Sequence, residues 1–161
     1  CIFILMDEKK LLKYSIDYLS KFDTSKKNLK DVLQRKIFKL KNNSSEKKIL
    51  FNSIESILNK LEKNNFINDN RYLLSKINYL SQSGKSTKYI SHYLLKKGID
   101  KQDIENGINQ FSYENLNWEI NSAQLFAKKK KLLESDEIYE KKLAKMARAG
   151  FSYEICKKIL G

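Results

Sequence analysis

The chain has 161 residues, a length that suits one domain or a short array of small units. Its 41% of hydrophobic residues can form a core, but no apolar run approaches the roughly 18 residues of a membrane-crossing helix. One histidine and two cysteines without a CxxC pair exclude a disulfide framework, argue against a metal site, and predict a reducing, cytoplasmic setting.

The net charge of +13 has two interpretations. A strongly basic chain favours polyanionic partners, such as nucleic acid, an acidic protein or a membrane surface. However, almost all of this charge comes from lysine, with arginine only at positions 35, 71 and 148, and asparagine and isoleucine are abundant. An AT-rich genome produces the same bias. We favour a polyanionic partner, and the compositional explanation stays open.

The first six residues, CIFILM, are apolar but lack the basic segment and the cleavage site of a signal peptide. They are also too few to cross a membrane. We interpret residues 1–7 as a truncated apolar stub, the cut end of a longer chain.

From residue 8 onward the apolar residues follow a helical period. They recur at i, i+4 and i+7, and the chain contains no proline, so each run predicts an amphipathic helix with one face to bury. In chain order the runs lie at 12–19, 29–37, 50–61, 73–80, 104–111, 116–127 and 155–160. No segment shows the alternation of a β-strand. We therefore predict an all-α fold.

Two tripeptides indicate an internal repeat. GID at 98–100 and GFS at 150–152 each combine a glycine that ends one helix, an apolar residue and a cap for the next helix. They lie 52 positions apart, and a less regular first copy connects its helices through KLKNNSSEKKI. A period of about 50 predicts an array of three-helix repeats, with boundaries at 8–65, 66–112 and 113–161.

The triplet Gly84-Lys85-Ser86 matches the end of the phosphate-binding loop GxxxxGK[ST]. That loop needs an earlier glycine, where this chain has Tyr79, and a buried strand before it, where this chain has a helical run. We therefore interpret the segment as a turn followed by a helix cap at Ser86-Thr87. Further candidate caps are Thr24-Ser25 and Ser135-Asp136.

The segment NNFINDNRYLLSKINYLSQSGKSTKYISHYLLKKGIDKQDIENGI, residues 64–108, resembles the centre of the RecX family of recombination regulators. The matching stretches are Phe-Ile-Asn-Asp-x-Arg-Tyr from residue 66, the turn at Gly84, and Ile-xxx-Leu-xx-Lys-Gly-Ile from residue 90. The end of the chain is similar to the family's closing motif, so the resemblance covers roughly residues 8–161. The departures from the family pattern are Asn65 for Gly, Asn68 for Asp, Lys85-Ser86 for Gly-Pro, and Ala149 for Arg.

This resemblance implies a fold, a partner and a function. The fold is all-α, with three tandem three-helix repeats in an elongated, curved array. The partner is the RecA recombinase filament on DNA, in whose groove such a protein lies as a monomer, with weak contact to single- or double-stranded DNA and none to membranes. The expected function is to inhibit the recombinase, ATPase and co-protease activities of RecA, without enzymatic activity, cofactor or metal.

The candidate partner- and nucleic-acid-binding residues are cations and one histidine. They are Arg71, Lys85, Lys88, His92, Lys96, Lys97, Lys128, Lys129, Lys130 and Lys131. Each group has a structural alternative: an ion pair with Asp69 for the arginine, a helix-dipole contact for the pair at 96–97, and a solvated face for the run at 128–131.

Three tyrosines, Tyr79, Tyr89 and Tyr93, interleave with these cations. Such aromatic residues stack on exposed bases or, more often, pack between helices. We expect Trp118 to anchor one repeat on another and Cys156 to be a small core residue.

The chain has no constellation of catalytic residues: no paired carboxylates, no nucleophile beside a base and no metal cluster stand out. Two functions besides filament regulation stay open. One is a stand-alone DNA-binding protein made of helix-turn-helix-like modules. The other is a scaffold for a different acidic protein, with lysines that only reflect composition.

Overall fold

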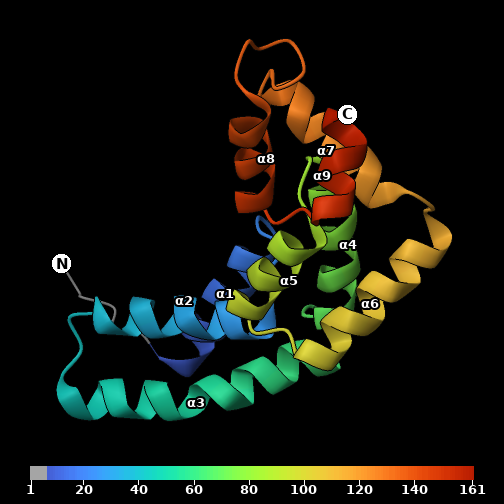
Figure 1. The fold of residues 1–161 in the computed structure, drawn as a ribbon. Coiled ribbons are helices and arrows are strands. Elements are labelled where there is room, and N and C mark those ends of the chain that lie inside the picture. The colour runs from blue at the N-terminus through green and yellow to red at the C-terminus, as the bar shows by residue number, and fades with distance from the viewer. Residues whose placement is uncertain (1–6) are drawn as a thin grey trace. The chain divides into compact units, whose positions relative to one another are not determined.

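The structure, a computed structural model, describes residues 7–161, and all regular elements in that range are α-helices (Figure 1). They are α1 (Glu8–Leu19), α2 (Lys26–Phe38), α3 (Ser44–Lys63), α4 (Asp69–Gln82), α5 (Thr87–Lys96), α6 (Lys101–Glu114), α7 (Trp118–Lys129), α8 (Tyr139–Arg148) and α9 (Tyr153–Leu160). The predicted all-α class is confirmed. Apart from Asp7, the stub expected at the N-terminus lies outside the described residues. None of the described helices has the length and apolarity to cross a bilayer.

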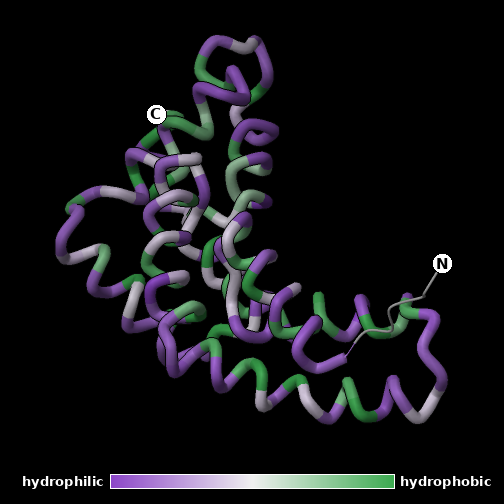
Figure 2. The backbone as a smooth tube through the Cα atoms, turned by 180° about the vertical axis from the view of Figure 1, so that it is seen from behind, coloured by the Kyte–Doolittle hydropathy of each residue, from purple (hydrophilic) through white to green (hydrophobic). Residues whose placement is uncertain are grey.

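The chain divides into two compact units, and the boundary in the sequence lies between Tyr72 and Leu73. In the first unit, α1, α2 and α3 contact one another, and α2 and α3 lie side by side (Figure 1). Hydrophobic positions recur along each of these helices (Figure 2). The core residues of this unit, at most 2% exposed, are Leu11, Leu29, Leu33, Ile37, Leu50, Ile54, Ile57, Leu58, Leu61 and, after α3, Ile67. The three repeat boundaries stay a prediction.

The buried face of α1 differs from the predicted one. The sequence period placed Leu12, Ile16 and Leu19 in the core. The structure packs Leu12 and Leu19 against the core only partly buried, fully buries Leu11 and Ser15, and leaves Ile16 36% exposed. Ser15 can be buried because its hydroxyl donates to the carbonyl of Leu11, at 2.8 Å, so no polar atom is left unpaired.

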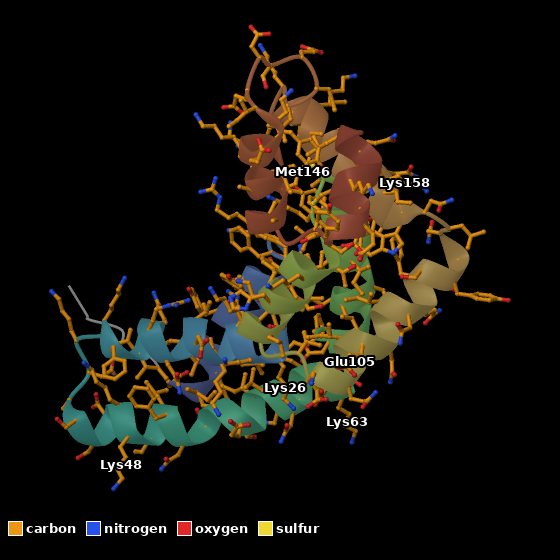
Figure 3. The ribbon with its side chains drawn as sticks, viewed as in Figure 1. Lys26, Lys48, Lys63, Glu105, Met146 and Lys158 are labelled. Atoms are coloured by element: carbon orange, nitrogen blue, oxygen red, sulfur yellow. The ribbon has the colours of Figure 1, made fainter. Side chains whose placement is uncertain are left out.

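In the second unit, α7, α8 and α9 surround a small core. Its buried residues are Ala123, Ala127, Leu132, Met146, Phe151 and Cys156. Met146 lies on the side of α8 that faces the other two helices, whereas Lys158 points outward (Figure 3). The core position predicted for Cys156 is confirmed, and burial raises the pKa of its thiol. Leu116, expected on the buried face of α7, instead precedes that helix and is 80% exposed.

Five helices end in the same backbone motif. The second residue beyond each helix has a positive φ, and the residue after it donates its N–H to the carbonyl five positions earlier. This is the Schellman motif, which satisfies the last carbonyls of a helix and favours glycine at the positive φ. The positive-φ residues are Asn65, Gly84, Gly98, Lys131 and Gly150, after α3, α4, α5, α7 and α8. Asparagine adopts this conformation more easily than most residues, which explains how Asn65 replaces a glycine.

Lys131→Gly is expected to raise the free energy of unfolding by about 0.5–1 kcal/mol. A lysine with φ of 53° loses roughly 1–2 kcal/mol to backbone strain, and the greater freedom of glycine in the unfolded chain offsets part of the gain. Urea unfolding measures the change. Lys130→Gly is the matched control, because its φ of −91° suits lysine and the same charge is lost. This control should be destabilised, and stabilisation of both variants would contradict the strain argument.

Most predicted caps are confirmed. Ser25, Ser86, Asp100 and Ser152 precede α2, α5, α6 and α9, and the side chain of each accepts a backbone N–H of the first turn. The cap expected at Ser135-Asp136 is wrong, because α8 begins later, after Ile138, which has no capping side chain.

The residues before α8 have other bonds. Ser135 donates its hydroxyl to the carbonyl of Leu132, and Glu137 pairs with Lys145. Hydrogen bonding from Lys145 lowers the pKa of Glu137. The Glu137–Lys145 pair holds the end of the α7–α8 loop against α8, and Ser135 forms a bond within the loop instead of capping the helix.

Candidate cationic surface at the Gly84 turn

The turn Gly84–Thr87, between α4 and α5, is bonded to α7. The Ser122 hydroxyl donates to the carbonyl of Lys85 at 2.8 Å. Both the N–H and the hydroxyl of Thr87 donate to the carboxylate of Glu119, each at 2.8 Å. The α-carbon of Gly84 lies so close to α7 that an added Cβ would be 3.2 Å from the backbone nitrogen of Phe126.

The same turn is bonded to the α8–α9 turn through Ser86, which is fully buried. Its hydroxyl donates to the carbonyl of Ala149 at 2.7 Å and accepts the N–H of Tyr89 at 3.2 Å. One side chain therefore caps α5 and joins two turns that are 63 residues apart in the sequence.

These bonds leave no phosphate cradle. The N–H groups of Gly84 and Lys85 donate to carbonyls of α4, and the N–H of Thr87 donates to Glu119. A phosphate-binding loop offers its N–H groups to the ligand and follows a strand, whereas this turn follows a helix and receives a carboxylate. The interpretation of Gly84–Thr87 as a turn with a cap is confirmed.

A similar bond occurs in the first unit. The N–H of Lys26, the first residue of α2, donates at 2.8 Å to the carboxylate of Asp69, the first residue of α4. In both units the residue after a capping serine donates to an acid in the first turn of a later helix. This pattern was missed in the sequence, where an acid early in a helix has an ordinary explanation in the helix dipole.

Glu119→Ala is expected to lower the free energy of unfolding by about 2 kcal/mol, because hydrogen bonds to a charged acceptor contribute roughly 1.5–3 kcal/mol and two partly buried donors lose their partner. Glu114→Ala removes the same charge from an exposed side chain that, within residues 7–161, accepts only from Gln110, and should cost less than about 0.5 kcal/mol. Urea unfolding of both variants decides, and equal losses would contradict the assigned role of Glu119.

Three of the predicted contact lysines meet at this turn. The Nζ of Lys129, at the end of α7, donates to the carbonyl of Ser83 at 3.2 Å. The Nζ of Lys85 lies 4.5 Å from the ring centroid of Tyr89, and the Cβ of Lys88 lies against Gly150. We call Lys85, Lys88 and Lys129 the turn cations. Arg148, exposed and adjacent to Ala149, is a further cation near this turn, and no pattern in the sequence singled it out.

The other predicted residues of the second unit lie on the same helices. His92 and Lys96 are exposed on α5, and Lys97 follows its end with Nζ 5.7 Å from the Tyr93 ring centroid. Lys128, Lys130 and Lys131 are exposed around the end of α7. The C-terminal placement of both groups also suits the helix dipole, so their contact role stays a prediction.

Arg71 belongs to the first unit, whereas the lysines described above belong to the second unit. Its side chain is exposed, and its N–H donates to Asn68, which caps α4. The alternative of an ion pair with Asp69 is not seen: that carboxylate accepts from Lys26, and Arg71 forms no salt bridge within residues 7–161. In the part of the chain that the structure describes, no three His, Cys, Asp or Glu side chains form a group that could hold a metal.

Comparisons with known proteins identify similar sequences. A regulatory protein RecX of Myxococcus xanthus is 29% identical over 154 residues, covering 91% of this chain and 81% of that protein. One of Streptococcus gordonii is 31% identical over 106 residues, and one of Bacillus licheniformis is 26% identical over 151 residues. The chain spans about half or less of the length of these last two relatives, at 41% and 53%. No model of a protein family matches it.

Solved structures agree in fold. A crystal structure of RecX from Lactobacillus salivarius superposes with a TM-score of 0.68 at 25% sequence identity, and covers 95% of this chain and 94% of that one. A second crystal structure, of a regulatory protein RecX, gives a TM-score of 0.70 at 22% identity over 94% of this chain.

Proposed function

Because the chain belongs to the RecX family of regulatory proteins, we propose that it binds the RecA recombinase filament on DNA as a monomer and inhibits it. Inhibition covers the recombinase, ATPase and co-protease activities. The protein itself performs no chemistry and needs no cofactor. Its relatives carry the name of regulators and not of enzymes, which supports this view.

The observation that carries the proposal is the meeting of the turn cations. Lys129 donates to the carbonyl of Ser83, which precedes the turn and lies 46 positions earlier in the sequence. Lys88 follows on the first turn of α5. Cations from two helices and a rigid turn are thus attached at one place, and such an arrangement suits regularly spaced phosphates and acidic side chains better than lysines scattered by composition.

The turn cations are held in a defined geometry. Hydrogen bonds to Glu119, Ser122 and Ala149 fix the backbone of the turn, so its lysines lose less conformational freedom on binding than lysines of a loose loop. Binding through phosphates releases counterions, and the affinity should therefore fall steeply with salt.

The proposal is tested on RecA filaments assembled on single-stranded DNA. Substoichiometric protein should lower ATP turnover, and co-sedimentation should show tighter binding to the filament than to the same DNA without RecA. Unchanged turnover at equimolar protein would contradict regulation. Equal affinity for bare DNA and filament would instead favour the stand-alone DNA-binding protein.

A further inference from the structure

A groove of about 300 Å³ lies between α4, α6 and α7 in the second unit. Its lining residues are Asn78, Ser81, Gln82, Phe111, Asn115, Leu116, Trp118, Asn121, Ser122 and Leu125. We propose that this groove binds an extended, uncharged peptide segment of the filament protein, with an apolar side chain inserted between Trp118 and the two leucines. The inference rests on the proposed function and assigns the protein contact within it.

The groove is free of charge in a highly charged chain. Charged residues make up 32% of the sequence and give it a net charge of +13, yet none of those that the structure describes lines the groove. A phosphate placed there would have no cation to neutralise it. A neutral peptide suits such walls, and a nucleotide, which carries its phosphate close to the base, does not.

The carboxamides of the groove have hydrogen-bonding capacity left over. Within residues 7–161 the side chain of Asn121 makes no hydrogen bond, and Asn115 uses only its Nδ2, which donates to the carbonyl of Phe111. Asn78 accepts from Gln82 and retains its own N–H groups. Carboxamides both donate and accept, which matches the alternating N–H and C=O groups of a peptide backbone.

The apolar part of the groove has a fixed aromatic side chain, Trp118, on one side and a solvent-exposed leucine, Leu116, on the other. Trp118 packs edge-on against Phe111, with ring centroids 5.6 Å apart, and its Nε1 donates to Ser112 at 2.8 Å. Leu116, 80% exposed, stands at the rim on the short link between α6 and α7. A fixed aromatic residue beside an exposed leucine provides the kind of anchor pocket that binds one apolar side chain.

The groove shares a wall with the cationic surface. Ser122 lines the groove and donates to the carbonyl of Lys85. Gln82 lines it too and precedes Ser83, to which Lys129 bonds. A partner that presents phosphates beside an uncharged protein segment, as a nucleoprotein filament does, can therefore occupy both sites together.

The test uses Leu116→Asp, with Tyr113→Asp as the matched control. Both positions are exposed, at 80% and 88%, and both substitutions lower the net charge to +12, but only Leu116 lines the groove. In co-sedimentation with RecA filaments, Leu116→Asp should weaken binding at least tenfold and leave the dependence on salt unchanged, because no phosphate contact is lost. Tyr113→Asp should bind as the wild type does. Equal affinities of all three proteins would overturn the inference.

A direct readout comes from Trp118, the only tryptophan of the chain. When it is replaced by 5-fluorotryptophan, its single fluorine resonance should shift with RecA filaments and stay unchanged with an oligothymidine strand alone. A shift with the oligonucleotide alone would assign the groove to a base and overturn the peptide proposal. If the wild type binds filaments and the resonance does not shift, the peptide-binding role of the groove is contradicted and the proposed function is not. If the wild type does not bind at all, the proposed function falls with it.

Discussion

Gly150→Ala is expected to lower the free energy of unfolding by about 3 kcal/mol. Gly150 has a φ of 94°, where a side chain adds roughly 1–2 kcal/mol of backbone strain. In addition, the new Cβ would lie 2.6 Å from the Ser86 hydroxyl and 3.1 Å from the Cβ of Lys88. Relief of this overlap displaces Ser86 from the carbonyl of Ala149, and the overpacking costs roughly 1–3 kcal/mol more. Urea unfolding, followed by circular dichroism, measures the loss.

Gly161→Ala is the control for the backbone term. Gly161 has the same φ of 94°, but no atom of the described residues, 7–161, lies within 4 Å of the position of its Cβ. Without an overlap it should cost no more than the backbone strain of roughly 1–2 kcal/mol, and less than Gly150→Ala. A loss at Gly150 no larger than about 1 kcal/mol would mean that the two turns joined by Ser86 can separate at little cost.

The features predicted correctly from the sequence are those set by neighbouring residues. A helix end depends on the backbone within about six positions, so the glycines at 98 and 150 and the caps after them identify the turns without knowledge of the fold. The helical period likewise located most of α2, α3 and α4, because their core leucines and isoleucines follow a single stripe.

The helical period of apolar residues predicted the wrong buried positions in two cases: where a helix has two adjacent apolar stripes, and where the helix is shorter than the apolar pattern. In α1 the apolar residues form two adjacent stripes, and burial of Ser15, which satisfies its own hydroxyl, selected the one with Leu11. Leu116 lies seven positions before Ala123 and so fits the helical period. However, α7 begins only at Trp118, so this leucine belongs to the link between α6 and α7. Phase alone does not tell where a helix begins.

The sequence predicted the cations of the candidate site, but it did not predict which of them lie close together in the fold. Lys129 and Ser83 are 46 positions apart, and Thr87 and Glu119 are 32 apart. No local pattern signals such pairs, because each residue also has an ordinary explanation near its own helix end. The amide-lined groove was missed for the same reason, since its residues come from three helices.

The Gly84 turn has a structural and a proposed functional role, and these belong to different atoms. Gly84, Ser86 and Thr87 hold the turn through backbone approach and hydrogen bonds. The charged ends of Lys85 and Lys88 make no hydrogen bond to another element within residues 7–161, although the carbonyl of Lys85 does. The charged end of Lys129 makes one exposed hydrogen bond to the turn, to the carbonyl of Ser83. The function of this surface can therefore be tested by side-chain charge at little cost to the fold.

The triple variant Lys85→Glu, Lys88→Glu, Lys129→Glu is expected to bind RecA filaments about a hundredfold more weakly than the wild type. Each exposed ionic contact contributes up to about 1 kcal/mol, and three of them give about 3 kcal/mol before any repulsion is counted. Loss of three phosphate contacts should also reduce the slope of log affinity against log salt by about 2 to 3. Co-sedimentation at several salt concentrations measures both quantities.

The control is Lys48→Glu, Lys63→Glu, Lys158→Glu, at three exposed lysines of α3 and α9 (Figure 3). Each reversal removes two positive charges, so both triple variants lower the net charge from +13 to +7. If the contact is local to the Gly84 turn, the control loses less than about tenfold, because none of its lysines belongs to that turn and exposed charges are partly screened at physiological salt. Equal losses would show that only overall charge matters, which would support the compositional explanation of the lysines and contradict a site at this turn.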